Sequence, residues 1–457
     1  MKDNRTQFLN TVLQQIKYRK IHPEISAELN SHIDELIEQY VSSGMDQDKA
    51  EEKAIRQMGD PVIIGAKLHK QHKPKTDWFL ISLMALLLCF SAFSLMAGES
   101  SIFANRKINF LIYLPAGIAA LIACYFLDYS KVQKWSLALY AAAAVLVWGT
   151  ILFCPSINGR PYLTVGSLSF NPSIVATPLF LISFAGLIIR YQGQGWSAII
   201  KLAVFCLFSV LTMIEYPSPS SALILVICYA VVWTVAIVKG NFQGSRTPYL
   251  LALYGTGLVV CLFLLVQLQP LESSRFTAFL DHGASDPTGY GWINYTLHQV
   301  LSSARFIGSS TVLPETVLPE SQTDFVFANI VSHGGWLMGI LLVLIVAAVI
   351  VRMFFLTRKV RHLYGYYLAL SACILLSVQF IANILMNLNL MPLFAISMPF
   401  ISYGGAGFVV SMALMGIVLS VWRYHLIIKP PVVPAANSSS GKWIFVQDGK
   451  LVIDFKK

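Results

Sequence analysis

One acidic residue, Asp324, stands where a polar stretch gives way to the apolar run 326–351. Its surroundings read Leu318-Pro-Glu-Ser-Gln-Thr-Asp-Phe-Val-Phe-Ala328. A carboxylate at the edge of an apolar run is costly to keep there unless it is paired or used. Such a group can act as a general base when its neighbours move its pKa toward the working pH. Asp324 is therefore our first candidate for a catalytic residue.

A structural role competes with this interpretation. Asp is among the preferred residues at a helix N-cap, because its side chain accepts a hydrogen bond from an orphan backbone N–H. A helix is expected from about Phe325, so Asp324 is well placed to cap it. From residue type and position alone, capping and catalysis remain alternatives.

The polar stretch before Asp324 is the long interval 268–325 between two apolar runs. Loops of that length in compact proteins are usually functional or disordered, and the aromatic residues of this one argue against disorder. We interpret His298 as a packing residue of the loop rather than a proton donor. The residues of the interval that could supply charge, protons or stacking are Arg275, Asp281, His282, Asp286, Tyr290, Trp292, His298 and Glu320.

Other chemistries lack their motifs. The chain has no glycine-rich phosphate loop after a strand, no HExxH zinc motif and no hydrolase-like Ser/His/Asp order, so nucleotide-driven transport is not expected. The seven cysteines lie in or beside apolar runs without a CxxC pair, and we interpret them as packing residues rather than disulfides or metal ligands. No cleavable signal peptide is expected, because the first apolar run begins only near residue 78.

The composition is that of a membrane protein. The 457 residues are 56% hydrophobic and 12% charged, with a mean hydropathy of +0.64. A helix of roughly 20 apolar residues crosses about 30 Å of hydrocarbon. The sequence therefore predicts an all-α integral membrane protein with about ten transmembrane helices. The expected spans are 78–97, 108–127, 134–154, 173–190, 197–214, 220–238, 248–267, 326–351, 364–388 and 401–425.

The distribution of Lys and Arg predicts the orientation. An even number of spans places both termini on one side, and basic residues concentrate in cytoplasmic loops. With cytoplasmic termini, eleven basic residues fall inside and five outside, and interval 268–325 becomes an extracellular loop. The inner residues are Lys131, Lys134, Arg190, Lys201, Lys239, Arg246, Arg352, Arg358, Lys359, Arg361 and Arg423, and the outer ones are Arg106, Lys107, Arg160, Arg275 and Arg305.

Two polar ends flank the membrane body, which we place at 77–427. Residues 1–76 hold 12 of the 33 Lys and Arg and 11 of the 23 Asp and Glu, and predict a cytoplasmic bundle of four short helices. Segments 28–34 and 58–61 resemble the small HAAS helical domain, which favours a docking or sensory module over a solubilising appendage. Residues 428–457 predict a cytoplasmic tail with a short hairpin turning at Asp448-Gly449.

Several segments resemble the SEDS family, the FtsW/RodA/SpoVE peptidoglycan polymerases, across about 78–427. The segment around Asp324, followed by Gly335-Trp336, is similar to one family signature. Met398-Pro-Phe-Ile-Ser-Tyr-Gly-Gly405, preceded by Leu390-Met-Pro392, is similar to the most specific one. Further matches are Ile157-Asn-Gly-Arg160 with Phe170-Asn-Pro-Ser173, Arg275-Phe-Thr-Ala-Phe-Leu-Asp281 and Tyr295-Thr-Leu-His-Gln299.

The resemblance implies a ten-helix glycosyltransferase of the bacterial plasma membrane that polymerises lipid II on the outer face, in elongation, division or sporulation. It implies that Asp324 deprotonates the acceptor hydroxyl while a polyprenyl pyrophosphate leaves, and that a class B penicillin-binding transpeptidase is the partner. A cation would stabilise the leaving pyrophosphate, and Arg160 and Arg275 are the candidates, with interfacial snorkelling as the alternative. The residues assigned to substrate binding are Arg160, Arg275, Gln299, Glu320, Thr323, Ser402, Tyr403, Gly404 and Gly405.

Charged family positions are replaced in this chain. The family continues Gln-Pro-Ser-Glu with a Lys shortly after, where this chain has Asn171-Pro-Ser-Ile-Val-Ala-Thr177. A family Gln-Pro-Asp segment corresponds to Tyr216-Pro-Ser-Pro-Ser-Ser221, which lacks the acid. Paired glutamates after the Asp-Phe helix start are replaced by Ser332 and His333. The chain is thus a divergent member, with a different substrate grip or with weak or no polymerase activity.

Three functions remain in view. The first is the lipid II polymerase; the second is a catalytically inactive scaffold or regulator of a transpeptidase, which the lost charges favour. The third is a transporter of a lipid-linked precursor, which the scarcity of acids in the apolar runs disfavours. No cofactor is certain, and a divalent cation (Mg or Mn) is left open, although no acidic cluster surrounds Asp324. The net charge of +10 indicates membrane lipids rather than nucleic acid.

Overall fold

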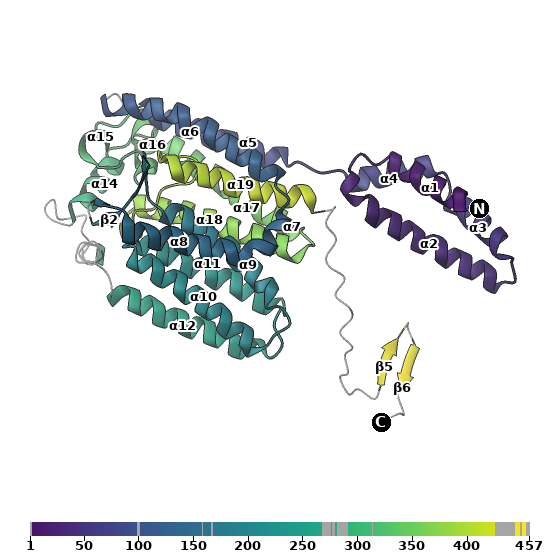
Figure 1. The fold of residues 1–457 in the computed structure, drawn as a ribbon. Coiled ribbons are helices and arrows are strands. Elements are labelled where there is room, and N and C mark those ends of the chain that lie inside the picture. Colours follow the sequence, from purple (N-terminus) through teal and green to yellow (C-terminus); the bar gives the residue numbers. More distant parts are fainter. Residues whose placement is uncertain are drawn as a thin grey trace.

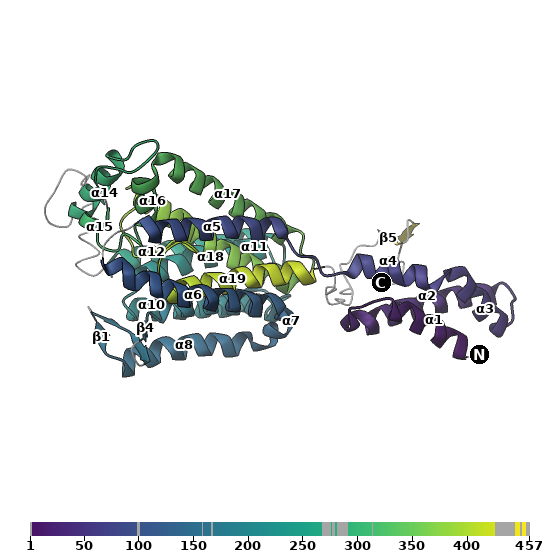
Figure 2. The ribbon, with the colours of Figure 1, turned by 90° about the horizontal axis from the view of Figure 1, so that it is seen from above.

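The computed structural model describes residues 2–97, 101–157, 159–165, 168–266, 276, 279–280, 291–312, 314–425, 444–447 and 450–453. A bundle of four helices projects from a larger helical body at the end where α7 lies, and α14, α15 and α16 lie at the opposite end (Figure 1, Figure 2). The body's long helices run roughly side by side, with α5 and α6 along one edge and α12 along the other (Figure 1).

The bundle consists of α1 (Lys2–Gln14), a 3-10 turn (Arg19–Ile21), α2 (His22–Ser42), α3 (Gln47–Met58) and α4 (Pro61–His72). Its core is a set of apolar residues at helical spacing: Phe8, Val12, Ile16, Ile25, Leu29, Ile33, Ala50 and Ala54.

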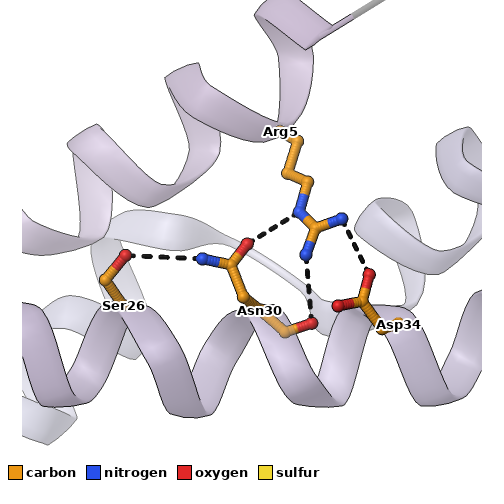
Figure 3. A network of polar contacts seen from close by, with 4 residues as sticks. All are labelled: Arg5, Ser26, Asn30 and Asp34. Carbon is orange, nitrogen blue, oxygen red and sulfur yellow. Dashed lines mark hydrogen bonds and ion pairs between the residues drawn. The ribbon is translucent and has the colours of Figure 1, made fainter.

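A polar contact ties α1 to α2 on the bundle surface. Arg5 donates from Nε to Asn30 Oδ1 at 2.7 Å and from Nη1 to Asp34 Oδ1 at 2.8 Å (Figure 3). Arg5 Nη2 also donates to the Asn30 carbonyl oxygen at 3.2 Å. One planar guanidinium thus bridges three acceptors on two turns of the neighbouring helix. The cytoplasmic placement of the bundle stays a prediction.

The helices of the body begin and end as follows: α5 (Trp78–Ala97), α6 (Ser101–Phe126), α7 (Tyr129–Val132), a 3-10 turn (Gln133–Trp135), α8 (Ser136–Phe153), α9 (Ser173–Arg190), α10 (Trp196–Glu215), α11 (Pro219–Val238), α12 (Arg246–Val266), α14 (Trp292–Ser302), α15 (Pro314–Val317), α16 (Val326–Gly334), α17 (Trp336–Arg358), α18 (Leu363–Asn387) and α19 (Gly405–Tyr424).

Among the described residues, nine helices are long and apolar enough to cross a membrane, and the apolar part of α6 that is described, Phe110–Phe126, is shorter. Helices α9 and α18 are the most buried of these, and both lie inside the body. The prediction of an all-α protein with multiple membrane spans is confirmed. We therefore describe the body as a membrane domain.

The predicted span 326–351 has the wrong bounds. The chain forms the short helix α16, breaks at Gly335 and starts a new helix, α17, which runs to Arg358. Gly335 has φ +85°, a conformation that L side chains rarely adopt, and a Cβ there would lie 2.5 Å from the Phe306 carbonyl oxygen. A hydropathy pattern cannot detect this break, because both sides of it are apolar. The spanning helix is therefore α17.

The described residues also form three antiparallel hairpins. Between α8 and α9, β1 (Ser156–Ile157) pairs with β2 (Arg160–Pro161), and β3 (Leu163–Val165) pairs with β4 (Leu168–Phe170). Near the carboxyl end, β5 (Ile444–Gln447) pairs with β6 (Lys450–Ile453). The turn predicted for that last hairpin, at Asp448-Gly449, lies outside the described residues.

An ion pair joins the start of α5 to α17. Arg352 donates from Nη2 to Asp77 Oδ2 at 2.5 Å and from Nε to Asp77 Oδ1 at 3.2 Å. Asp77 is 5% exposed and also accepts from the Leu80 backbone N–H at 2.8 Å. This buried carboxylate therefore serves as a helix cap and as an anchor between the two helices.

We expect Arg352→Gln to lower stability by about 3–5 kcal/mol, because it leaves the Asp77 carboxylate buried without its cation. The measurement is the melting temperature of the purified protein in detergent. Arg358→Gln, at the exposed end of the same helix, is the control and should melt like the wild type. A melting temperature of Arg352→Gln equal to that of the control would contradict a stabilising role for the pair.

Candidate functional site

A cavity of about 930 Å³ lies between α6, α9, α11, α18 and α19, and eight of the predicted site residues line it. They come from three separate parts of the chain: Arg160; Glu320, Thr323 and Asp324; and Ser402, Tyr403, Gly404 and Gly405. Gln299 lies exposed on α14 and is not among the lining residues. Arg275 lies outside the described residues. The cavity is therefore the candidate active site.

A tight turn before α16 presents Asp324 to the cavity. Glu320 has φ +53°, and its carbonyl oxygen accepts from the backbone N–H groups of Thr323 at 3.0 Å and Phe325 at 3.2 Å. Its carboxylate accepts from the Thr323 hydroxyl at 2.7 Å. These bonds fold the segment back on itself, and Asp324 lies half-buried directly before the helix.

The interpretation of Asp324 as the N-cap residue is wrong. The N-cap position of α16 belongs to Phe325, which makes no side-chain cap bond. In the first turn of α16, the Ala328 backbone N–H donates to Asn387 Oδ1 of α18 at 3.1 Å. A side chain from a different helix thus accepts from a first-turn N–H that is usually satisfied by a nearby residue of the same segment.

Two buried asparagines of α18 hold the backbone at Asp324. Asn383 Nδ2 and Asn387 Nδ2 each donate to the Asp324 carbonyl oxygen at 2.9 Å. Asn383 Nδ2 also donates to the Ile396 carbonyl oxygen at 2.7 Å, and both asparagines are 0% exposed. Our sequence analysis missed them. Two amides at i, i+4 in an apolar run were the available signal, because buried polar groups in a membrane helix need partners.

The segment 398–405 is bonded directly to the Asp324 turn. The Ser402 hydroxyl donates to the Thr323 carbonyl oxygen at 2.6 Å, and the Tyr403 backbone N–H donates to the Gln322 carbonyl oxygen at 2.8 Å. The Ser402 oxygen also accepts from the Met398 backbone N–H at 2.7 Å. Ser402 therefore holds together two loops that are far apart in the sequence.

Arg160 reaches the cavity from the β1–β2 hairpin. The Tyr216 hydroxyl, at the end of α10, donates to the Pro161 carbonyl oxygen at 2.7 Å and so fastens the hairpin beside Arg160. Burial raises the pKa of Tyr216, so the phenol keeps the proton that it donates. The protonated phenol thus fixes the backbone of the residue that follows Arg160. Arg160 is the only cation among the described lining residues.

Uncharged residues occupy the part of the cavity where the family pattern has charges. The Ser173 hydroxyl donates to Asn171 Oδ1 at 2.7 Å, and the Ser218 hydroxyl donates to Ser221 Oγ at 2.8 Å. The Ser221 hydroxyl donates in turn to Ser173 Oγ at 3.3 Å. Two replaced segments that are separate in the sequence therefore form one hydroxyl and amide cluster. Ser332, the third replaced position, is buried on α16 and bonds within its own helix.

Charged groups are few in the cavity. Its described lining contains one cation, Arg160, and two acids, Glu320 and Asp324. No group of three or more His, Cys, Asp or Glu that could hold a metal ion occurs in the described part of the chain. A metal cage built by protein side chains alone does not fit this lining. A requirement for Mg or Mn stays a prediction.

Adjacent glycines at the start of α19 have different surroundings. A Cβ on Gly405 would lie 2.2–2.6 Å from ring atoms of Tyr113, a cavity residue on α6, whereas a Cβ on Gly404 would meet nothing within 4 Å. We expect Gly405→Ala to lower stability by about 1–3 kcal/mol through overpacking. Gly404→Ala, the matched control, should melt like the wild type in detergent. Equal melting temperatures of the two variants would contradict close packing between α6 and α19.

Known proteins resemble this chain over most of its membrane domain. The family described as cell cycle protein, FtsW/RodA/SpoVE, matches residues 73–426. The chain is 26% identical over 391 residues to "Probable peptidoglycan glycosyltransferase FtsW" of Pseudomonas fluorescens, covering 81% of this chain and 93% of that protein. It is 24% identical over 369 residues to "Stage V sporulation protein E" of Bacillus subtilis, covering 76% and 94%. It is 26% identical over 345 residues to "Peptidoglycan glycosyltransferase MrdB" of Helicobacter pylori, covering 72% and 86%.

Solved structures share the fold. A chain of the structure described as "Structural coordination of polymerization and crosslinking by a peptidoglycan synthase complex" aligns with a TM-score of 0.63 and 21% identity, covering 76% of this chain and 98% of that one. The rod shape determining protein RodA of Thermus thermophilus aligns with a TM-score of 0.55 and 20% identity, covering 77% and 97%. The matched family range begins after α4, so it leaves the helical bundle outside.

Proposed function

The chain belongs to the FtsW/RodA/SpoVE family of cell cycle proteins, and from this premise we propose that it is a membrane glycosyltransferase that polymerises lipid II into peptidoglycan strands. Relatives named peptidoglycan glycosyltransferases support this activity. The observation that carries the proposal is the cavity in which a carboxylate and a cation, Asp324 and Arg160, come together from distant segments. A role in elongation, division or sporulation is a further proposal. The names of the relatives do not distinguish among these three roles.

In the proposed reaction, Asp324 is the general base. The acceptor sugar hydroxyl passes its proton to the Asp324 carboxylate as its oxygen bonds to the anomeric carbon of the donor. The bond from that carbon to the pyrophosphate oxygen breaks, and the polyprenyl pyrophosphate leaves with the electron pair. Arg160 balances the negative charge that develops on it. Asp324 then releases its proton to water, which restores the base for the next addition.

The other lining residues would bind and position the sugars. Glu320, Thr323 and Tyr403 border the base, and Ser402 fixes the distance between their two loops through its bond to the Thr323 carbonyl oxygen. Preorganised groups of this kind stabilise a transition state without reorganising during the reaction. Arg275 and Gln299 keep their proposed roles only if substrate binding brings them to the cavity.

The orientation and the partner belong to the same proposal. Both termini would be cytoplasmic and the cavity would open toward the outer face, as the distribution of Lys and Arg predicts. The partner would be a class B penicillin-binding transpeptidase. A structural neighbour whose description joins polymerisation to crosslinking supports that choice.

A second candidate is an inactive scaffold that holds a transpeptidase. The hydroxyl and amide cluster includes Ser218, which stands where the family pattern has an aspartate, and the loss of this charge favours the scaffold. In that case the cavity would persist without turnover, and the chain would act through its contacts alone.

The decisive experiment is polymerisation of labelled lipid II by the purified protein, alone and with candidate class B transpeptidases. Glycan strands that lengthen with time on a gel are the expected result. A folded protein that co-elutes with a transpeptidase and makes no strands under either condition would replace the polymerase with the scaffold.

A further inference from the structure

The far end of α19 carries an arginine enclosed by aromatic rings. The guanidinium carbon of Arg423 lies 4.6 Å from the Tyr125 ring centroid, 4.4 Å from that of Phe126 and 5.4 Å from that of Tyr424. We name these four residues the Arg423 cluster. It lies at the end of the body next to the helical bundle, away from the cavity at the start of α19 (Figure 1, Figure 2).

Two nitrogens of the Arg423 guanidinium lack acceptors among the described residues. Its Nε and Nη1 atoms are buried and have no hydrogen-bond partner in the described part of the chain. Aromatic faces attract the cation but do not replace hydrogen-bond acceptors for its N–H groups. Buried charged donors without acceptors are destabilising, so an acceptor from outside the described residues is expected. The residue as a whole is only half-buried, and a ligand can therefore reach it from the surface.

Further cations surround this end of the body. His425, which follows α19 and is 7% exposed, has a pKa that is lowered by burial and also by the charges of Lys75, Lys359 and Arg361. A hydrogen bond to the Trp422 carbonyl oxygen acts in the opposite direction. The concentration of positive charge therefore extends beyond Arg423 itself.

Two acids lie in the same region, and both have partners. Asp77 is paired with Arg352. Asp128 accepts from the Ser130 hydroxyl at 2.7 Å and from the Ser130 backbone N–H at 3.3 Å. Neither carboxylate accepts from the Nε or Nη1 atom of Arg423. The neighbourhood therefore favours an added anion.

We propose that the Arg423 cluster binds the phosphate of an anionic phospholipid. A phosphate offers several oxygens that one edge of the planar guanidinium can bind in a bidentate, charge-assisted contact. The end of a membrane-spanning helix is where headgroup phosphates lie, and basic sites between such helices are known to bind them. Phe126 of the cluster and the adjacent Leu127, 59% and 46% exposed, offer apolar surface to an acyl chain. This site is independent of the polymerase proposal.

The test uses the full-length protein in a neutral detergent and measures binding by native mass spectrometry and by melting temperature. The probes are phosphatidylglycerol, phosphatidylcholine and inorganic phosphate. Phosphatidylglycerol should bind and raise the melting temperature, whereas the other two probes should act far more weakly. Arg423→Gln should weaken phosphatidylglycerol binding about tenfold or more, because a charge-assisted bidentate contact is lost.

The matched control is Lys201→Gln. Lys201 also lies beside an aromatic ring, with its Nζ 5.2 Å from the Tyr191 centroid, and is also predicted to lie on the cytoplasmic side. Its substitution should leave binding unchanged. Arg423→Lys keeps the charge without the planar donors and should give an intermediate loss, which also tests the site if Arg423→Gln fails to fold.

Three outcomes would overturn the proposal. Equal binding of phosphatidylglycerol and phosphatidylcholine would show that charge is not recognised. Unchanged binding in both Arg423 variants would show that the phosphate lies elsewhere. An equal shift from inorganic phosphate alone would assign the site to free phosphate rather than to lipid.

Discussion

Replacing Asp324 with Asn is expected to lower the rate of glycan-strand synthesis by about 10²- to 10⁴-fold, the usual contribution of a general base. Asn keeps the size and polarity of the side chain but cannot accept the hydroxyl proton. The loops around it are held by hydrogen bonds from the Asn383 and Asn387 side chains and from the Tyr403 backbone N–H to backbone carbonyl oxygens, so the fold should persist. The measurement is the initial rate of lipid II polymerisation beside the melting temperature of each protein.

The control for this substitution is His298→Gln. His298 is exposed on α14 and is not among the residues that line the cavity. The His298→Gln substitution removes a titratable side chain from the same polar interval and should leave the rate of strand synthesis unchanged. Asp324→Glu keeps the carboxylate and should recover part of the rate. Wild-type synthesis by Asp324→Asn would mean that the proton goes to another acceptor.

Asn387→Leu is expected to affect both stability and rate. It removes the bonds to the Asp324 carbonyl oxygen and from the Ala328 backbone N–H, and it leaves both backbone groups without those partners in a buried place. Each buried polar group that loses its partner costs about 1–3 kcal/mol, so stability should fall by roughly 2–5 kcal/mol. The rate should fall as well, because the backbone that carries the base loses one of its two amide contacts.

The kinetics distinguish positioning from loss of fold. At temperatures where Asn387→Leu is fully folded, the turnover number should fall more than substrate affinity does, because Asn387 contacts the base segment and does not line the cavity. Asn389→Gly is the control. Asn389 is nearby and has φ +56°, which Gly adopts readily, and its side chain donates to the Asn294 carbonyl oxygen at 3.0 Å. Equal stability and equal turnover of the two variants would contradict a positioning role for Asn387.

The residues around Asp324 show which parts of the site the sequence motifs could predict. The segments 318–328 and 398–405 were recognisable in the sequence, and the structure places them side by side. What the motifs did not reveal was the role of Ser402, whose hydroxyl bonds to the Thr323 carbonyl oxygen across 79 positions. A hydroxyl that could contact substrate and one that holds a loop look identical in a sequence.

The sequence by itself determined the membrane class and the main spans. Every backbone N–H and C=O inside a bilayer needs a partner, so an apolar run of roughly 20 residues has little choice but to form a helix. That reason is local, and for this reason the predicted spans and the spanning helices largely agree. The exception is Gly335 at the start of α17, where the chain passes so close to Phe306 of another segment that a Cβ would not fit.

Only the tertiary structure decided which polar groups meet. Asn387 caps α16, Ser173 meets Ser221, and Arg423 lies among three rings with two buried nitrogens that find no acceptor in the described part of the chain. Each of these relations joins positions on different helices or at their ends, and helix packing brings them into contact. Hydropathy and spacing describe one helix at a time and contain no information on which partner helix lies opposite. The cavity, the support of its base and the proposed phosphate site therefore depend on packing.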